Sequence, residues 1–408
     1  MKALKAGGVV GCVILISLAV HESLPDTKVL VFSNANGTEA QSHLGYVPDM
    51  YAAFISTDGR IFGIEDHFLY VSEDGGRLFR QFGVLPKANA DWFEKIKNHI
   101  ARSKLARTFR KNPGPTNVIV LSSGTILVFY DHIYRSVNNG VTFESVFSFG
   151  SDIGAPFGHG EGIAVGPDDT VYFGEYITTP RPHQVRVFRG SRDGTEWDIV
   201  HTFPAGEIFH IHSIQFDPYR SRYWITTGDS DAESKILYTD DGFQSIHRLG
   251  GGSQDWRVVS LMITKEHLYW GSDNDREPAG IFRWRFMNRD FSKIIEIGKP
   301  SYFSTILRDG TLVLSTTYEP QSPYTGKYRP DATTDLWGSR DGSNWIKLLS
   351  LPYEAHDTEW GPSRAAIAFP GGTATNELLF TPLSTRGNRY DTHFLTPDLP
   401  AYHDAARS

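Results

Sequence analysis

The sequence has only one cysteine, Cys12, among 408 residues, so an internal disulfide framework is excluded. Helical periodicity is scarce, and basic residues are too few to outweigh the acidic ones, which leaves a formal net charge of −7. Because phosphate binding requires a basic face, this charge argues against nucleic acid as a partner. A long membrane-spanning run is also missing, since the apolar stretch at 6–20 has 15 residues and a span needs about 20.

That short apolar stretch follows Lys2 and Lys5 and precedes polar residues, which is typical of a secretory signal. We therefore interpret residues 1–23 as a signal peptide, with Ser17-Leu18-Ala19 as the cleavage site. An uncleaved N-terminal anchor is the alternative, and lipid attachment at Cys12 is a third. We expect a secreted, periplasmic or cell-surface protein that meets a membrane only through such an anchor.

Aromatic residues (13%) and glycine (39 residues) are plentiful, which favours β structure. A motif of Ser or Thr, then Asp or Asn, then Gly and usually an aromatic residue recurs at 72–79, 136–143, 191–197, 239–243 and 339–345. The polar side chains bond the backbone of a tight turn, and the glycine permits positive φ. The spacing, about 50 residues or a multiple of it, predicts a degenerate copy at 285–291.

This motif resembles the Asp-box, or BNR, repeat of sialidase-like β-propellers. Two further strand-like runs precede each copy, which makes the four strands of a propeller blade. We predict an all-β fold with one domain at 27–398, a seven-bladed β-propeller, with six blades as the alternative. The strand at 28–32 would close the ring on the seventh blade. An amphipathic helix with a basic face is expected at 88–109, and 399–408 would form a tail.

Strands in a blade alternate in direction, so the motif turns share one face and the blade-to-blade loops share the other. Polar residues gather at the second face, where we expect one axial mouth. Inner strands begin with His159 and Glu161, His210 and His212, Arg257, Tyr302, and Arg364. Second strands end with Glu175 and Tyr176, Asp229 and Asp231, Asp273 and Asp275, and Tyr318 and Glu319.

His210 and His212 are two apart on a strand and should share a face, and His159 and Glu161 repeat that spacing one blade earlier. The predicted catalytic residues are His159, His210, His212, Tyr176 and Arg257. The predicted substrate-binding residues are Glu161, Glu175, Asp229, Asp273, Tyr302, Tyr318 and Arg364. The three histidines with a carboxylate are also candidate ligands for Zn or Mn.

In role, these residues resemble those of seven-bladed propeller lyases of the oligogalacturonate and ulvan type. That resemblance implies β-elimination on an acidic polysaccharide: Arg257 or a metal neutralises the uronate carboxylate, a histidine removes the adjacent proton, and Tyr176 or another histidine assists the leaving oxygen. A non-catalytic glycan- or protein-binding propeller remains an alternative. A sialidase is a further one, although its Arg-Ile-Pro signature is missing and only Arg257 and Arg364 begin inner strands.

Overall fold

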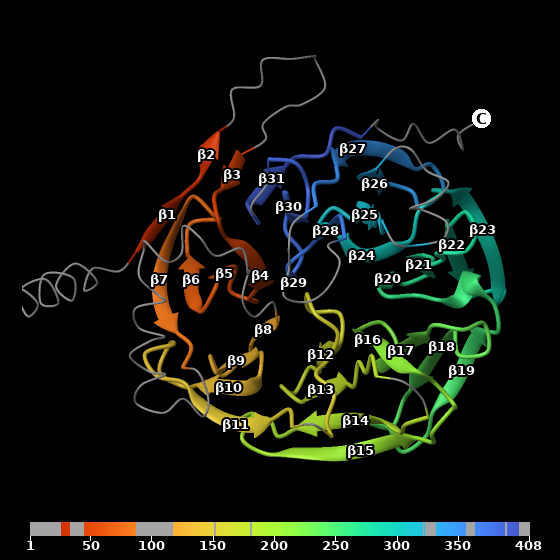
Figure 1. Ribbon diagram of the computed structural model, residues 1–408, viewed down its shortest axis with the longest axis horizontal. Coiled ribbons are helices and arrows are strands. Elements are labelled where there is room, and N and C mark those ends of the chain that lie inside the picture. Colours follow the sequence, from red (N-terminus) through yellow and green to blue (C-terminus); the bar gives the residue numbers. More distant parts are fainter. Residues whose placement is uncertain are drawn as a thin grey trace, which may run out of the picture.

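The computed structural model describes residues 26–32, 45–86, 117–150, 152–179, 182–320, 322, 332–355, 364–387 and 390–399. In this part of the chain, seven sheets are arranged in a ring (Figure 1). The predicted signal or anchor (1–23), the predicted helix at 88–109 and residues 400–408 of the predicted tail lie outside the described residues. Within them, the one helix is a 3-10 turn, η1 (Gln254–Trp256). No described helix is long and apolar enough to cross a membrane.

Each blade is built on four antiparallel strands, to which blades one and seven add short extra strands, and the first of the four lies nearest the centre of the ring. Blades one to three are β4–β7 (Tyr51–Ile55, Ile61–Glu65, Phe68–Ser72, Leu78–Val84), β8–β11 (Asn117–Val120, Ile126–Phe129, His132–Ser136, Glu144–Ser148) and β12–β15 (Ile163–Val165, Val171–Gly174, Val185–Gly190, Trp197–Phe203). Blades four to six are β16–β19 (His210–Asp217, Arg222–Gly228, Lys235–Thr239, His247–Gly251), β20–β23 (Met262–Ile263, His267–Gly271, Gly280–Arg285, Asp290–Glu296) and β24–β27 (Ser301–Ile306, Leu312–Thr316, Thr333–Ser339, Ile346–Pro352).

The seventh blade is completed by the N-terminal part of the chain. Its strands β28 (Ala366–Ala368), β30 (Leu378–Leu383) and β31 (Thr392–Leu395) are followed in the sheet by β3 (Gly45–Val47) and β2 (Val31–Phe32). The predicted closure by an N-terminal strand is thus confirmed, although β3 supplies the contact with β31. Residues 28–32 divide between two blades, because β1 (Thr27–Val29) pairs with β7 of blade one. A short strand of blade seven, β29 (Gly371–Gly372), also pairs with β4.

The recurring motif forms the turn between the third and fourth strand of a blade. In all five copies the Ser or Thr hydroxyl donates to the Asp or Asn side chain two residues later, at 2.7 to 3.1 Å. The same carboxylate or amide oxygen accepts backbone N–H groups further along the turn, such as those of Arg77 and Leu78 on Asp74. The degenerate copy lies at the same place in blade five, between its third and fourth strands β22 and β23.

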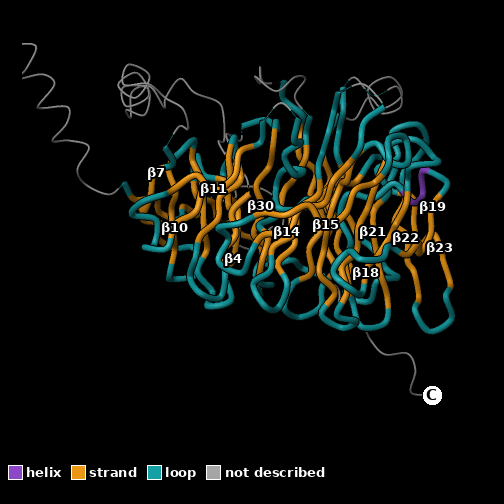
Figure 2. Tube along the Cα trace, turned by 90° about the horizontal axis from the view of Figure 1, so that it is seen from below, coloured by secondary structure: helices purple, strands orange, loops and turns teal. Residues whose placement is uncertain are grey.

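Apolar side chains of neighbouring blades pack against one another to form the core. Trp224 of blade four and Trp270 of blade five are fully buried in one such cluster. In blade five, Phe282 and Phe291 stack with their ring planes within 7°. Seen from the side, the strands form one layer with loops at both ends (Figure 2). Since the blades fix the strand ends, they also fix the polar residues that begin or follow the strands.

One connection reaches inward to meet blades across the ring. His159 bonds the hydroxyl of Tyr51 in blade one through Nδ1 (2.8 Å), and its ring lies 5.3 Å from that of Phe303 in blade six. The N–H of Gly160 donates to Asn117 of blade two at 2.5 Å. We call this connection, residues 155–162, the axial loop. The prediction that His159 and Glu161 lie on a strand was wrong: both precede β12, and His159 has a φ of 64°.

Candidate functional site

Two histidines face each other at the start of the inner strand of blade four. His210 begins β16, and the strand has a bulge between Ile211 and Ser213 that leaves His212 without a partner in the register. The Nε2 atoms of the two imidazoles lie 2.9 Å apart. The predicted shared face is therefore confirmed, and the bulge helps to aim the second ring at the first.

The other nitrogen of each ring is occupied by a backbone carbonyl. Nδ1 of His210 donates to the oxygen of Ile177, and Nδ1 of His212 donates to the oxygen of Val258, both at 2.9 Å. Because a carbonyl only accepts, each neutral ring carries its proton on Nδ1 and a lone pair on Nε2. Burial lowers the pKa of His212 to about 4, so this ring is neutral at pH 7. Two lone pairs at 2.9 Å repel each other unless a proton or a cation lies between them.

Asp229 completes this group from the loop after β17. Its Oδ1 lies 3.4 Å from each Nε2 atom, and its side chain is one-third exposed. Gly228 permits the close approach, because a Cβ there would lie 2.5 Å from Cε1 of His212. Burial raises the pKa of Asp229, but the Arg257 guanidinium, together with a proton on either facing Nε2 atom, holds this pKa far below its usual range. We call His210, His212 and Asp229 the histidine–aspartate group.

The ligand atoms of this group all lie within 4.8 Å of one another. Two imidazole nitrogens and a carboxylate oxygen are donors that Zn and Mn accept, and an exposed Asp229 leaves an open side for further ligands. His159, the third predicted ligand, does not belong to the group. The donors present therefore fit a divalent cation, and they comprise two of the three predicted histidines with one carboxylate, Asp229.

Arg257 lies beside this group and contacts three carboxylates. Its Nη2 is 3.1 Å from Oδ1 of Asp229, its Nε is 3.0 Å from Asp273, and its Nη1 is 3.0 Å from Asp275. Asp273 is buried, and burial raises its pKa well above the usual value despite the guanidinium. Its Oδ1 has no hydrogen-bond partner among the described residues. Asp273 and Asp229 thus contact the same guanidinium, yet their pKa values are shifted in opposite directions.

The histidine–aspartate group and Arg257 line one side of the axial mouth that the sequence predicted. Residues of blades six and seven line the opposite side. Glu319 follows β25 and accepts a hydrogen bond from the hydroxyl of Tyr302, and the same carboxylate oxygen lies 3.2 Å from Nε of Arg364. The Arg364 side chain is half exposed, and its guanidinium lies 5.9 Å from the ring of Tyr302. Burial, together with the nearby carboxylates, keeps the pKa of Tyr302 well above its usual value.

Tyr176 connects the two sides. Its ring stacks on His210 with the centroids 4.0 Å apart and contacts Phe157 of the axial loop at 4.8 Å. Burial and the charge of Asp229 raise its pKa well above the usual value, while Arg364 and Arg257 act in the opposite direction. Tyr176 is therefore a protonated phenol within reach of the charges of both sides.

The structure brings eight of the twelve predicted site residues into this one mouth, contributed by blades three to seven. They are Tyr176, His210, His212, Asp229, Arg257, Asp273, Tyr302 and Arg364. Asp275 and Glu319 belong to it as well, although they were not among the predicted site residues. The sequence feature that could have identified Asp275 and Glu319 was their position at the ends of second strands, beside Asp273 and Tyr318.

Four predicted residues lie elsewhere. His159 and Glu161 belong to the axial loop, where burial raises the pKa of Glu161 to about 8 although Ser260 donates a hydrogen bond to it. Glu175 is fully buried, and its two oxygens accept hydrogen bonds from Arg186 and from the backbone of Gly154. Tyr318 is buried and packs on Tyr353 at 5.2 Å. None of these contacts involves the histidine–aspartate group.

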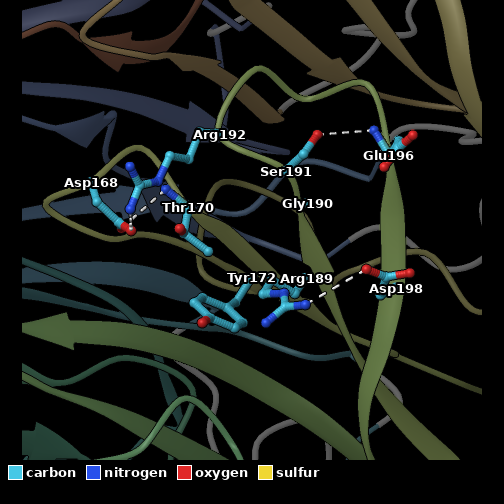
Figure 3. A pocket seen from close by; sticks show the side chains of 9 residues that line it. All are labelled: Asp168, Thr170, Tyr172, Arg189, Gly190, Ser191, Arg192, Glu196 and Asp198. Atoms are coloured by element: carbon cyan, nitrogen blue, oxygen red, sulfur yellow. Dashed lines mark hydrogen bonds and ion pairs between the residues drawn. The ribbon is translucent and has the colours of Figure 1, made fainter.

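A groove of about 400 Å³ occurs on blade three near its motif turn, among Asp168, Tyr172, Arg189, Arg192 and Asp198 (Figure 3). Arg192 points to Asp168 at 3.1 Å and Arg189 points to Asp198 at 3.6 Å. Its two arginines thus each pair with one carboxylate on an exposed surface. This groove lacks the combination of imidazoles, carboxylates and guanidinium groups that the mouth brings together.

No protein-family model and no curated protein matches the chain. Among solved structures, the chain is similar to an oligogalacturonate lyase in complex with manganese, with a TM-score of 0.58, 9% identity, and 92% of this chain and 98% of the other covered. For an oligogalacturonate lyase from Vibrio parahaemolyticus the TM-score is 0.56 and the identity 9%, with 92% of this chain and 99% of the other covered. For a GH74 xyloglucanase from Xanthomonas campestris the TM-score is 0.53 and the identity 14%, with 91% of this chain and 56% of the other covered. At these identities the likeness shows a shared propeller fold.

Proposed function

We propose that this protein acts on an acidic polysaccharide by β-elimination, with a divalent cation held by the histidine–aspartate group. The observation that carries the proposal is the pair of Nε2 atoms facing each other at 2.9 Å with Asp229 beside them. The fold shared with oligogalacturonate lyases, one of them in complex with manganese, supports it. The apolar stretch at 6–20 would export the protein to where such polymers occur.

The charges of the mouth explain why a cation is needed. Four carboxylates face two guanidinium groups there: Asp229, Asp273, Asp275 and Glu319 against Arg257 and Arg364. An anionic sugar alone would meet excess negative charge. A bound divalent cation would neutralise the uronate carboxylate and make the adjacent C–H more acidic.

We assign the proton steps to residues on opposite sides of the mouth. Glu319, a carboxylate, accepts the proton from the carbon next to the uronate carboxylate. The electron pair of that C–H bond forms the new C=C bond, and the bond to the glycosidic oxygen breaks. Tyr176 gives its proton to the leaving oxygen, for which its high pKa keeps it protonated. Exchange with solvent then returns the proton from Glu319 to Tyr176.

The test is to incubate the purified protein with a panel of uronate polymers, with added Mn²⁺ or Zn²⁺ and with a chelator. We expect ultraviolet absorbance from an unsaturated uronate on at least one polymer, and loss of that signal with the chelator. Saturable binding without absorbance on every polymer would refute the lyase and favour a non-catalytic glycan-binding propeller. Release of sialic acid would favour the sialidase.

One observation favours a glycoside hydrolase as the second candidate. Asp229 and Asp273 flank the same guanidinium, yet the pKa of Asp229 is lowered and that of Asp273 is raised. Two carboxylates with pKa values pushed apart are the acid and base pattern of glycosidases. A hydrolase would generate reducing ends without ultraviolet absorbance, and the same incubation distinguishes the two reactions.

A further inference from the structure

Arg257 and the histidine pair converge on a single oxygen atom. Oδ1 of Asp229 lies 3.1 Å from Nη2 of Arg257 and 3.4 Å from Nε2 of each histidine. A cation bound between the imidazoles and Asp229 would therefore meet a permanent positive charge at its carboxylate ligand. Arg257 stays charged under all ordinary conditions, so this competition does not depend on pH.

Arg257 would keep its position after losing Asp229. Asp273 and Asp275 hold its Nε and Nη1 at 3.0 Å each, and its side chain is only 11% exposed. Only Nη2 would be released, at the edge of the mouth where Asp229 is one-third exposed. A guanidinium edge with free N–H groups is a preferred partner for a carboxylate.

We propose that Arg257 couples cation binding to anion binding. In the cation-free protein its Nη2 group occupies Asp229 and weakens the binding of a divalent cation. When the cation takes Asp229, Nη2 is released and binds the carboxylate of the sugar, so each ligand increases the affinity for the other. This inference rests on the cation site of the proposed function and adds an order of binding, cation before substrate.

The competing explanation is that Arg257 only positions Asp229, and the two make opposite predictions. If Arg257 competes with the cation, Arg257→Gln increases the affinity for Mn²⁺, because a charge next to the ligand oxygen is removed. If Arg257 only positions Asp229, the same substitution weakens Mn²⁺ binding. Arg257→Lys retains the charge and should leave the affinity near that of the wild type. Arg364→Gln is the matched control, since it removes a guanidinium of the mouth that contacts Glu319 rather than Asp229.

Titration calorimetry with Mn²⁺ alone, and then with saturating galacturonate, tests the coupling. We expect Arg257→Gln to bind Mn²⁺ roughly tenfold more tightly, and galacturonate to tighten Mn²⁺ binding by about fivefold or more in the wild type but not in this variant. Unchanged or weaker Mn²⁺ binding by a folded Arg257→Gln protein would overturn the inference. So would the absence of any galacturonate effect in the wild type, a measurement that needs no variant.

Turnover separates this inference from the proposed function. Coupled binding of Mn²⁺ and galacturonate without an unsaturated product on any polymer would refute the lyase and leave the coupling intact. An unsaturated product formed without coupled binding would refute the coupling and leave the lyase intact.

Discussion

The two faces of the propeller satisfy their polar groups in different ways. On the face with the motif turns, a carboxylate or amide is bonded by a hydroxyl two residues away and by the backbone of the same turn, as Asp74 is by Ser72, Arg77 and Leu78. In the mouth, each polar group meets partners from other parts of the ring, as Arg257 does with Asp229. A local turn saturates its own groups, whereas the mouth places two Nε2 atoms face to face and gathers four carboxylates around two guanidinium groups.

The largest effect should follow removal of the two imidazoles. Replacing both His210 and His212 by Gln should lower Mn²⁺ affinity and turnover by more than about 100-fold, because a neutral amide oxygen is a weaker metal ligand than an imidazole nitrogen. Titration calorimetry and the absorbance assay measure the two quantities. His67→Gln, an imidazole bonded to Asp66 outside the group, is the control. Metal binding that survives the double substitution would contradict the metal site.

The next effect concerns Tyr176 and Tyr318, two of the three tyrosines that the sequence placed in the mouth. Tyr176→Phe should lower kcat by about 100-fold, because it removes the proton donor, and should leave Mn²⁺ affinity unchanged. Tyr318→Phe is its matched control, since Tyr318 packs on Tyr353 and should leave kcat unchanged. Equal losses in the two variants would mean that the structure does not distinguish their roles.

The axial loop should make stability depend on pH through Glu161. Its pKa is about 8 in the folded protein and near 4.5 when unfolded, so the folded state binds its proton more tightly between these values. The stability of the wild type should therefore fall, relative to Glu161→Gln, as pH rises from about 4.5 to about 8, by about 5 kcal/mol. Urea unfolding of both proteins at several pH values measures this difference. A constant difference would show that Glu161 titrates normally.

The smallest effect belongs to the motif turns. Asp74→Ala removes an acceptor of three hydrogen bonds and should destabilise the fold by about 1 kcal/mol without changing kcat. Glu73→Ala, in the same turn and exposed, should change neither quantity. Thermal unfolding and the absorbance assay check both variants. A loss of turnover in Asp74→Ala would contradict the view that the face with the motif turns serves stability and the mouth serves function.

Features determined by a few neighbouring residues were predictable from the sequence. The motif repeats predicted seven blades and the face on which the polar loops lie, and the spacing of His210 and His212 predicted that they share one face of the strand. Asp229, Asp273 and Arg257 were predicted for the mouth because strand ends bring them to one edge.

Other features depend on contacts between distant segments. The axial loop is held by the contact of His159 with Tyr51, 108 residues earlier in the chain. No pattern in the neighbouring residues indicates that His159 and Glu161 lie before β12 rather than in it. Glu175 is fully buried and pairs with Arg186, 11 residues later in the chain, whereas Asp229 stays one-third exposed. Asp275 and Glu319 stood at predicted strand ends, but their importance became visible only when Arg257, Tyr302 and Arg364 were found in contact with them.

The closure of the ring has a consequence for the order of folding. β3, near the beginning of the chain, completes its sheet only by pairing with β31, near the end, with Tyr46 opposite His393. During synthesis the first of these strands therefore waits for almost the whole chain before its partner exists. Pairing of segments so distant in sequence is slow, and until it occurs the first and seventh blades keep open edges that other chains could join.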